Sequence, residues 1–156
     1  MSLRVDGRAI LELLAESKLK SIQVYRRFAA DRELGDPYFE TMAKNSAELH
    51  DAFLILAKQA KADGGWVVEE GDYHYFRLRL ERSLLSDPAN LSSRADKVQS
   101  QMDVLKLAER IECETLEILR ELEDIVPRFA PKELKAMKGQ TKAHLKNLTE
   151  GIRDLS

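Results

Sequence analysis

Five side chains of this sequence carry groups that bind metal ions, and they lie on or beside the apolar faces of predicted helices. Carboxylates and neutral imidazoles are the ligands that iron, manganese and zinc take in proteins. A side chain on a buried helix face loses its water, and an unpaired imidazole there is costly. A metal ion would replace that water and neutralise the carboxylates. The pattern therefore predicts a metal site built from Glu16, His50, Glu109, Glu112 and His144.

The depths of these residues along their helices can be compared by counting from the turns. At about 1.5 Å per residue, Glu112 and His144 both lie roughly 20 Å from the turn between the last two helices. We therefore expect these two side chains to face each other. Glu16 and His50 match less well, with an offset of about one helical turn. Glu109 shares a helix face with Glu112, three residues away.

A second interpretation of the same residues needs no metal. The histidines would be imidazoles at the edge of the core, hydrogen-bonded to Glu112, to Thr141 or to the backbone. The glutamates would be charges on the flank of a bundle, paired with Lys20 or Arg110. The residues alone leave both interpretations open.

The elements that would position these side chains are long helices. Apolar residues make up 44% of the chain and glycine and proline are scarce, which favours helices. Apolar positions at helical spacing, with turn residues between them, predict four helices at about 7–34, 37–62, 93–125 and 131–152. Short links make the first two and the last two antiparallel hairpins. The fold class is therefore all-α, a ferritin-like four-helix bundle whose hairpins are joined by a long crossover.

That crossover, residues 63–92, is expected to have structure of its own. Residues 72–85 predict a short helix, with Tyr75, Phe76 and Leu78 among the side chains that could pack over the bundle. Residues 64–70 favour an extended segment, with Trp66 as an anchor.

Composition limits the class of protein. A chain of 156 residues suits a single domain, residues 1–156. A net charge of −2 and the absence of a recognition motif argue against a nucleic-acid partner. No apolar run approaches the ~18 residues that span a bilayer, so we expect no membrane insertion. The single cysteine, Cys113, and the absence of a signal peptide predict a cytoplasmic protein.

Four segments together resemble the rubrerythrin branch of the ferritin-like superfamily. ESKLKSIQVYRRFA (16–29) is similar to that family's first helix, with a glutamate near its start and Tyr25 nine residues on. ERIECET (109–115) is similar to the Glu-x-x-Glu segment of its third helix. The family's second and fourth helices resemble ETMAKNSAELHDAF (40–53) and KELKAMKGQTKAHLKNL (132–148).

The resemblance implies a di-metal carboxylate site for iron or manganese. Glu16 and Glu109 or Glu112 would be terminal ligands, with His50 and His144 beside them. The family's bridging glutamates would stand three residues before each histidine, where this chain has Ala47 and Thr141. The family's four-cysteine iron module is also missing, so the site is expected to be degenerate.

Three functions follow as hypotheses. The first is a metal-binding protein, an oxidoreductase acting on peroxide or oxygen with a redox partner that the sequence does not name. The alternative is a metal-free bundle that works as a binding or regulatory module. The third is a helical interaction protein, a homodimer formed through the crossover segment with its aromatic residues.

Overall fold

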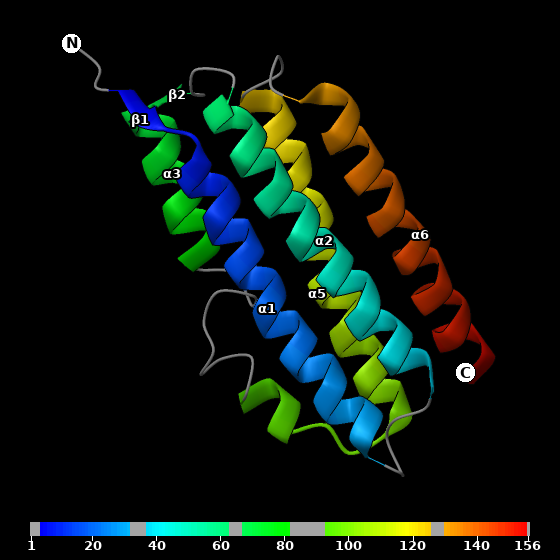
Figure 1. Cartoon of the computed structure of the whole chain (residues 1–156). Helices are drawn as coiled ribbons and strands as arrows, with labels where there is room; N and C mark the ends of the chain where they lie inside the picture. The colour runs from blue at the N-terminus through cyan, green and yellow to red at the C-terminus, as the bar shows by residue number, and fades with distance from the viewer. Residues whose placement is uncertain (1–3, 32–36, 63–66, 82–92, 126–129, 156) are drawn as a thin grey trace.

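Four long helices form the body of the molecule, which is a helical bundle (Figure 1). The structure is a computed structural model that describes residues 4–31, 37–62, 67–81, 93–125 and 130–155. The prediction of an all-α bundle is confirmed at this level. The long helices are α1 (Arg8–Ala30), α2 (Pro37–Ala62), α5 (Gln101–Ile125) and α6 (Pro131–Leu155).

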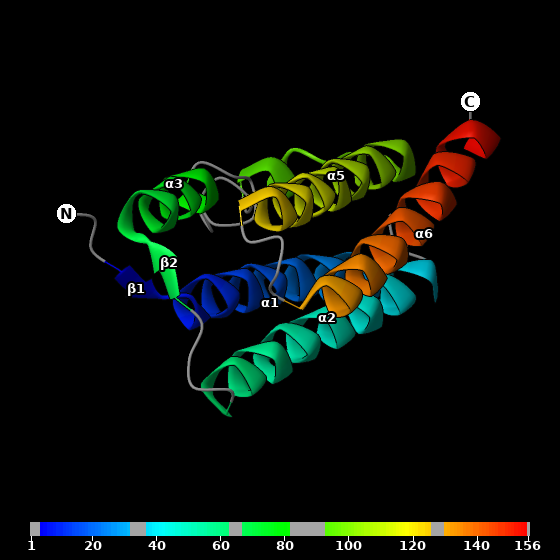
Figure 2. The ribbon, with the colours of Figure 1, turned by 90° about the horizontal axis from the view of Figure 1, so that it is seen from above.

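The helices pair as two hairpins, as their short links require. Helix α1 runs antiparallel to α2, and α5 runs antiparallel to α6, while α2 and α5 run in the same direction (Figure 1). Seen from above, α1 is drawn between α5 and α2, and α6 is inclined to α5 (Figure 2). The predicted bounds of the second helix agree with those of α2, and the predicted fourth helix extends three residues further, to Leu155.

The helix predicted to begin at residue 93 begins later. Only one helical turn lies at 93–96, and α5 starts at Gln101. Local polar side chains explain the break. The Asp103 N–H donates to Ser100 Oγ at 3.1 Å, and Asp103 Oδ2 accepts from the Gln99 N–H at 3.2 Å. Such reciprocal bonds satisfy the free N–H groups at a helix start.

A short β-ribbon and a short helix stand outside the bundle. Strand β1 (Arg4–Asp6) pairs antiparallel with β2 (Val67–Glu69), with Val5 opposite Val68. Strand β2 leads directly into α3 (Glu70–Glu81). These elements bear out the expected extended segment and short helix as far as they are described, whereas Trp66 and residues 82–92 lie outside the described part.

Helix α3 rests on the bundle through one face only. Phe76 and Leu80 are fully buried in a core cluster shared with the long helices. Tyr75 and Leu78 are about half exposed, which corrects the expectation that both would pack on the bundle. Because positions 76 and 80 are one turn apart, positions 75 and 78 necessarily point elsewhere.

The apolar core is divided into two halves along the bundle. One cluster includes Leu14, Leu49, Leu119 and Leu134, and the other includes Phe28, Phe39, Ile111 and Leu148. In each long helix, buried polar residues lie between its contributions to the two clusters. A polar layer therefore crosses the middle of the bundle, made of Ser17, Lys18, Ser21, Ser46, Glu112, Thr115, Thr141 and His144.

Candidate functional site

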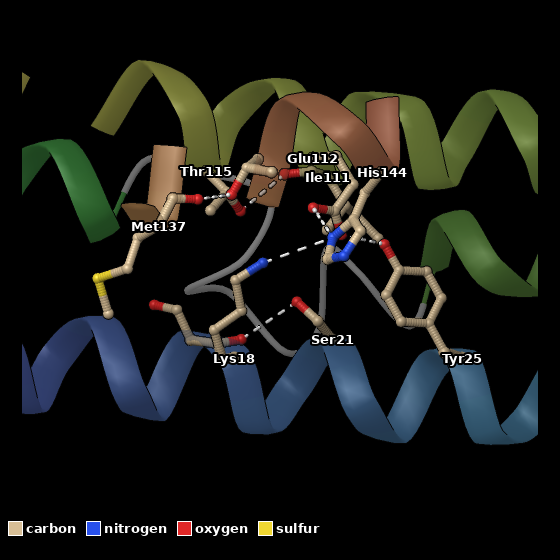
Figure 3. A network of polar contacts seen from close by, with 10 residues as sticks. Lys18, Ser21, Tyr25, Ile111, Glu112, Thr115, Met137 and His144 are labelled. Carbon is tan, nitrogen blue, oxygen red and sulfur yellow. Dashed lines mark hydrogen bonds and ion pairs between the residues drawn. The ribbon is translucent and has the colours of Figure 1, made fainter. Parts of the chain in front are cut away.

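Most buried hydroxyls of the polar layer donate hydrogen bonds to carbonyls of their own helices. Ser21 Oγ donates to the Ser17 carbonyl at 3.4 Å, Thr115 Oγ1 to the Ile111 carbonyl at 3.1 Å, and Thr141 Oγ1 to the Met137 carbonyl at 2.9 Å (Figure 3). Back-bonding to the carbonyl four residues earlier is a common arrangement for helical serine and threonine. These donors are thus directed at backbone, and the charged groups of the layer depend on one another.

Glu112 is the centre of the charged group. Its side chain is fully buried, and Tyr25 Oη donates a 2.9 Å hydrogen bond to Oε1. The Lys18 ammonium, equally buried, lies 3.9 Å from the same oxygen. His144 Nδ1 lies 3.8 Å from the other oxygen, Oε2. Figure 3 shows these side chains converging from α1, α5 and α6, so the site ties the two hairpins together.

The buried charges depend on each other electrostatically. Burial acts to raise the pKa of Glu112, but Lys18, His144 and the Tyr25 hydroxyl together hold it below its usual 4.5. Burial lowers the pKa of Lys18 from its usual 10.5, and the Glu112 carboxylate opposes part of that shift. Removing either partner would leave a buried charge without compensation, which is strongly unfavourable.

Two atoms of this pair have unused hydrogen-bonding capacity. Within the described residues, neither Lys18 Nζ nor Glu112 Oε2 has a hydrogen-bond partner. The 3.9 Å separation from Glu112 Oε1 is an ion-pair distance and exceeds a good N–H···O bond. The ammonium and the carboxylate therefore interact through charge, with Tyr25 supplying the short hydrogen bond.

Acid should weaken the fold partly through Glu112. The pKa of Glu112 is lower in the folded than in the unfolded chain, so its stabilising contribution is present above pH 4.5 and disappears as the pH falls through the folded pKa. The free energy of unfolding, measured by denaturant titration at several pH values, should fall less steeply with acid in Glu112→Gln than in the wild type. Glu109→Gln, one turn earlier on α5 and partly exposed, is the matched control and should keep the wild-type slope. Equal slopes for all three proteins would contradict the assignment.

The structure brings two of the five predicted ligands together. Glu112 and His144 face each other at 3.8 Å, as their depths along the helices predicted. Glu109 lies partly buried, one turn before Glu112. His50 is partly buried, and its Nδ1 lies 3.0 Å from the carboxylate of Asp51, its exposed neighbour. Ser46, one turn before His50, provides the contribution of α2 to the polar layer.

Glu16 lies outside the layer. It is exposed and lines a hollow of about 390 Å³ between α1 and α3, with Lys20, Tyr73 and Arg77 among its neighbours. The expectation that all four long helices direct a carboxylate or an imidazole to one dry place is therefore wrong for Glu16. The polar layer does receive side chains from all four helices, but α1 supplies an ammonium and a phenol.

Lys18 was missed by sequence reasoning, although a signal existed. Buried residues on α1 recur at positions 11, 14, 18, 21, 25 and 28, which are alternating steps of three and four. Lys18 occupies one of these core positions. The prediction of Glu16 as a buried ligand instead requires the face of α1 that carries Leu13 and Leu19 to be apolar and buried, but Leu13 is only partly buried and Leu19 is 45% exposed. The corrected stripe selects Lys18 and Tyr25 together.

The donor set of the layer does not fit a di-metal centre. Around Glu112 the residues offer one carboxylate, one imidazole and one phenol, beside a cationic ammonium. Paired metal ions need bridging carboxylates and three or more protein ligands each. Within the described ranges, no three histidine, cysteine, aspartate or glutamate side chains are grouped so as to hold a metal ion.

Comparisons with known proteins give no match: no family model, no curated protein and no solved structure matches this chain. Among the described helices, none is both long and apolar enough to cross a membrane. The class that fold and site define is therefore a helical bundle with a buried lysine–glutamate pair at its centre.

Proposed function

We propose that this chain is a ferritin-like bundle in which the Lys18 ammonium takes the place of a metal centre, and that it works as a binding or regulatory module. The parallel course of α2 and α5, with an antiparallel hairpin on either side, supports the ferritin-like arrangement. The observation that carries the proposal is the buried ion pair of Lys18 and Glu112, 3.9 Å apart in the middle of the bundle.

The positive charge of Lys18, beside Glu112, argues against a metal ion at this carboxylate. Unit charges 4 Å apart interact by about 4 kcal/mol at an effective dielectric constant of ~20, and a divalent ion doubles that figure. A metal ion bound to Glu112 would be repelled by the adjacent ammonium. The carboxylate is also neutralised already, so a metal would have to displace Lys18 or remove its proton.

The surface of the bundle supports a binding role. A hollow of about 440 Å³ near the end of α6 has Phe39, Leu105 and Leu155 among its apolar residues and Glu150 and Asp154 among its acidic ones. Hollows of this size accommodate small ligands. Tyr75 and Leu78 of α3, each about half exposed, support the homodimer that the third hypothesis places at the crossover.

The metal-centred oxidoreductase is the second candidate function, favoured by the contact between Glu112 and His144. Glu112 Oε2 has no hydrogen-bond partner among the described residues and lies 3.8 Å from the imidazole. Burial lowers the pKa of Lys18, which makes loss of its proton easier. Iron or manganese would supply electron transfer to peroxide or oxygen. His144 and Glu112 would then act as ligands.

Metal content distinguishes the two candidates. We expect protein purified from cells grown with added iron and manganese to carry far less than one ion per chain, measured by elemental analysis. His50→Ala/His144→Ala should leave that content unchanged, because no metal depends on these residues. Stoichiometric metal in the wild type that is lost in the double variant would overturn the proposal and favour the oxidoreductase.

A further inference from the structure

A basic hollow lies beside the start of α5. The start of α5 is at the lower end of the bundle in Figure 1. Its volume is about 380 Å³, and the side chains of Val98 and Leu107 give it apolar surface. Its remaining lining residues are the acidic Asp103 and the four basic residues Arg94, Lys97, Lys106 and Arg110. We propose that this hollow binds a small molecule through a phosphate or diphosphate group.

Charge is the first argument. Four cations and one carboxylate surround this hollow in a chain whose net charge is −2. Asp103 has a structural task, since its Oδ2 accepts the Gln99 N–H at the start of α5. Asp96, in the adjoining helical turn, is already paired with Arg27 at 2.6 Å. The four cations and the one carboxylate leave the lining of the hollow with a formal net charge of +3, since 4 − 1 = 3.

The state of the four cations is the second argument. Within the part of the chain that is described, none of their side chains forms an ion pair or hydrogen bond. Other basic side chains of the chain do have partners: Arg79 contacts Glu117 and Glu121, and Lys138 contacts Glu123. Like charges gathered around one hollow repel one another, and a multivalent anion removes that cost.

The residue types indicate phosphate. Arginine offers a planar fork of N–H donors that matches phosphate oxygens two at a time, and lysine adds a strong point charge. Four such groups suit two or more negative charges better than a single carboxylate. The apolar surface of Val98 and Leu107 can contact the uncharged part of the ligand. The cations surround one hollow and do not form a long stripe, which favours a small molecule over a nucleic acid or a membrane.

The two sides of the hollow are held in position without a ligand. Ala95 is buried in the core, and the Arg27–Asp96 ion pair ties the 93–96 turn to α1. On the other side, Lys106 and Arg110 are one turn apart on α5, whose start is fixed by Ser100 and Asp103. A site held in this way loses little freedom when it binds.

The test is calorimetric titration of the full chain with pyrophosphate and with inorganic phosphate at low ionic strength. We expect saturable 1:1 binding of pyrophosphate that weakens as salt is added. Lys106→Gln/Arg110→Gln should raise the dissociation constant by about tenfold or more, because two charge-assisted contacts are lost. Lys142→Gln/Lys146→Gln removes two exposed lysines at the same four-residue spacing on α6, and should change it by less than about twofold.

Three results would overturn the inference. They are no saturable binding of either anion by the wild type, an equal loss of affinity in both double variants, and binding only to phosphatidylserine vesicles. Unfolding curves of both variants should match the wild type, since all four substituted side chains are exposed. The inference uses no residue of the Lys18–Glu112 pair. A metal found at Glu112 would therefore contradict the proposed function without affecting the inferred phosphate site. Absence of pyrophosphate binding would contradict the phosphate site without affecting the proposed function.

Discussion

Lys18→Met is expected to lower the free energy of unfolding by about 3–5 kcal/mol, because it leaves the Glu112 carboxylate buried without its cation. Methionine fills a similar volume, so the loss reports charge more than packing. Tyr25 and His144 would remain beside Glu112, but one hydrogen bond from a neutral phenol does not compensate a full buried charge. Urea or guanidinium denaturation followed by circular dichroism gives the measurement.

The double variant Lys18→Met/Glu112→Gln isolates the cause. Glutamine keeps an oxygen that can accept from Tyr25 and removes the negative charge, so stability should return to within about 1 kcal/mol of the wild type. Lys142→Met, an exposed lysine on α6, controls for the change of residue type and should have an effect within about 0.5 kcal/mol. If Lys18→Met alone were neutral, Glu112 would have to be uncharged in the fold, and the site would need a different description.

The presence of the long helices was predictable because it depends on local sequence signals, namely apolar spacing and turn residues. Pro37 is suited to the first position of a helix, and α2 begins there, in agreement with the predicted bounds. The later start of α5 was predictable too, since Ser100 and Asp103 have the spacing of an N-terminal capping pair. The apolar positions of residues 93–100 also fit helical spacing, so the predicted helix was extended back to residue 93 in spite of that capping signal. Polar capping residues thus define the start of this helix better than the spacing of apolar residues does.

The content of the polar layer was harder to predict. Counting residues from the link between the last two helices identified Glu112 and His144 as facing each other, because the rise per residue of a helix is regular. The rotation of α1 about its axis depends on the neighbours that it meets, which include α3 as well as the other long helices. In the structure, Lys18 is buried beside Glu112 of α5, and Glu16 is exposed beside α3. Pairing of β1 with β2 likewise joins segments about sixty residues apart, for which the sequence offers no local signal.

Phe76→Ala should be about as damaging as the loss of Lys18, lowering the free energy of unfolding by about 3–5 kcal/mol. Phe76 is fully buried in a cluster that includes residues of α1, α2, α5 and α6, such as Leu11, Leu56, Leu119 and Leu134. Removing its ring leaves a cavity that these well-packed neighbours can fill only in part. Leu78→Ala, two residues further along α3 and about half exposed, is the matched control and should cost about 0.5 kcal/mol or less.

The same variant tests whether α3 belongs to the cooperative fold. A helix of 12 residues is marginal alone, so α3 depends on its contact with the bundle. If α3 and the bundle unfold together, the amides of α3 and α1 should lose hydrogen-exchange protection in parallel in Phe76→Ala. Loss of protection in α3 alone, with the global free energy of unfolding unchanged, would make α3 a separable element. The hollow between α1 and α3 would then open when α3 separates from the bundle, because Tyr73 and Leu80 of α3 line it.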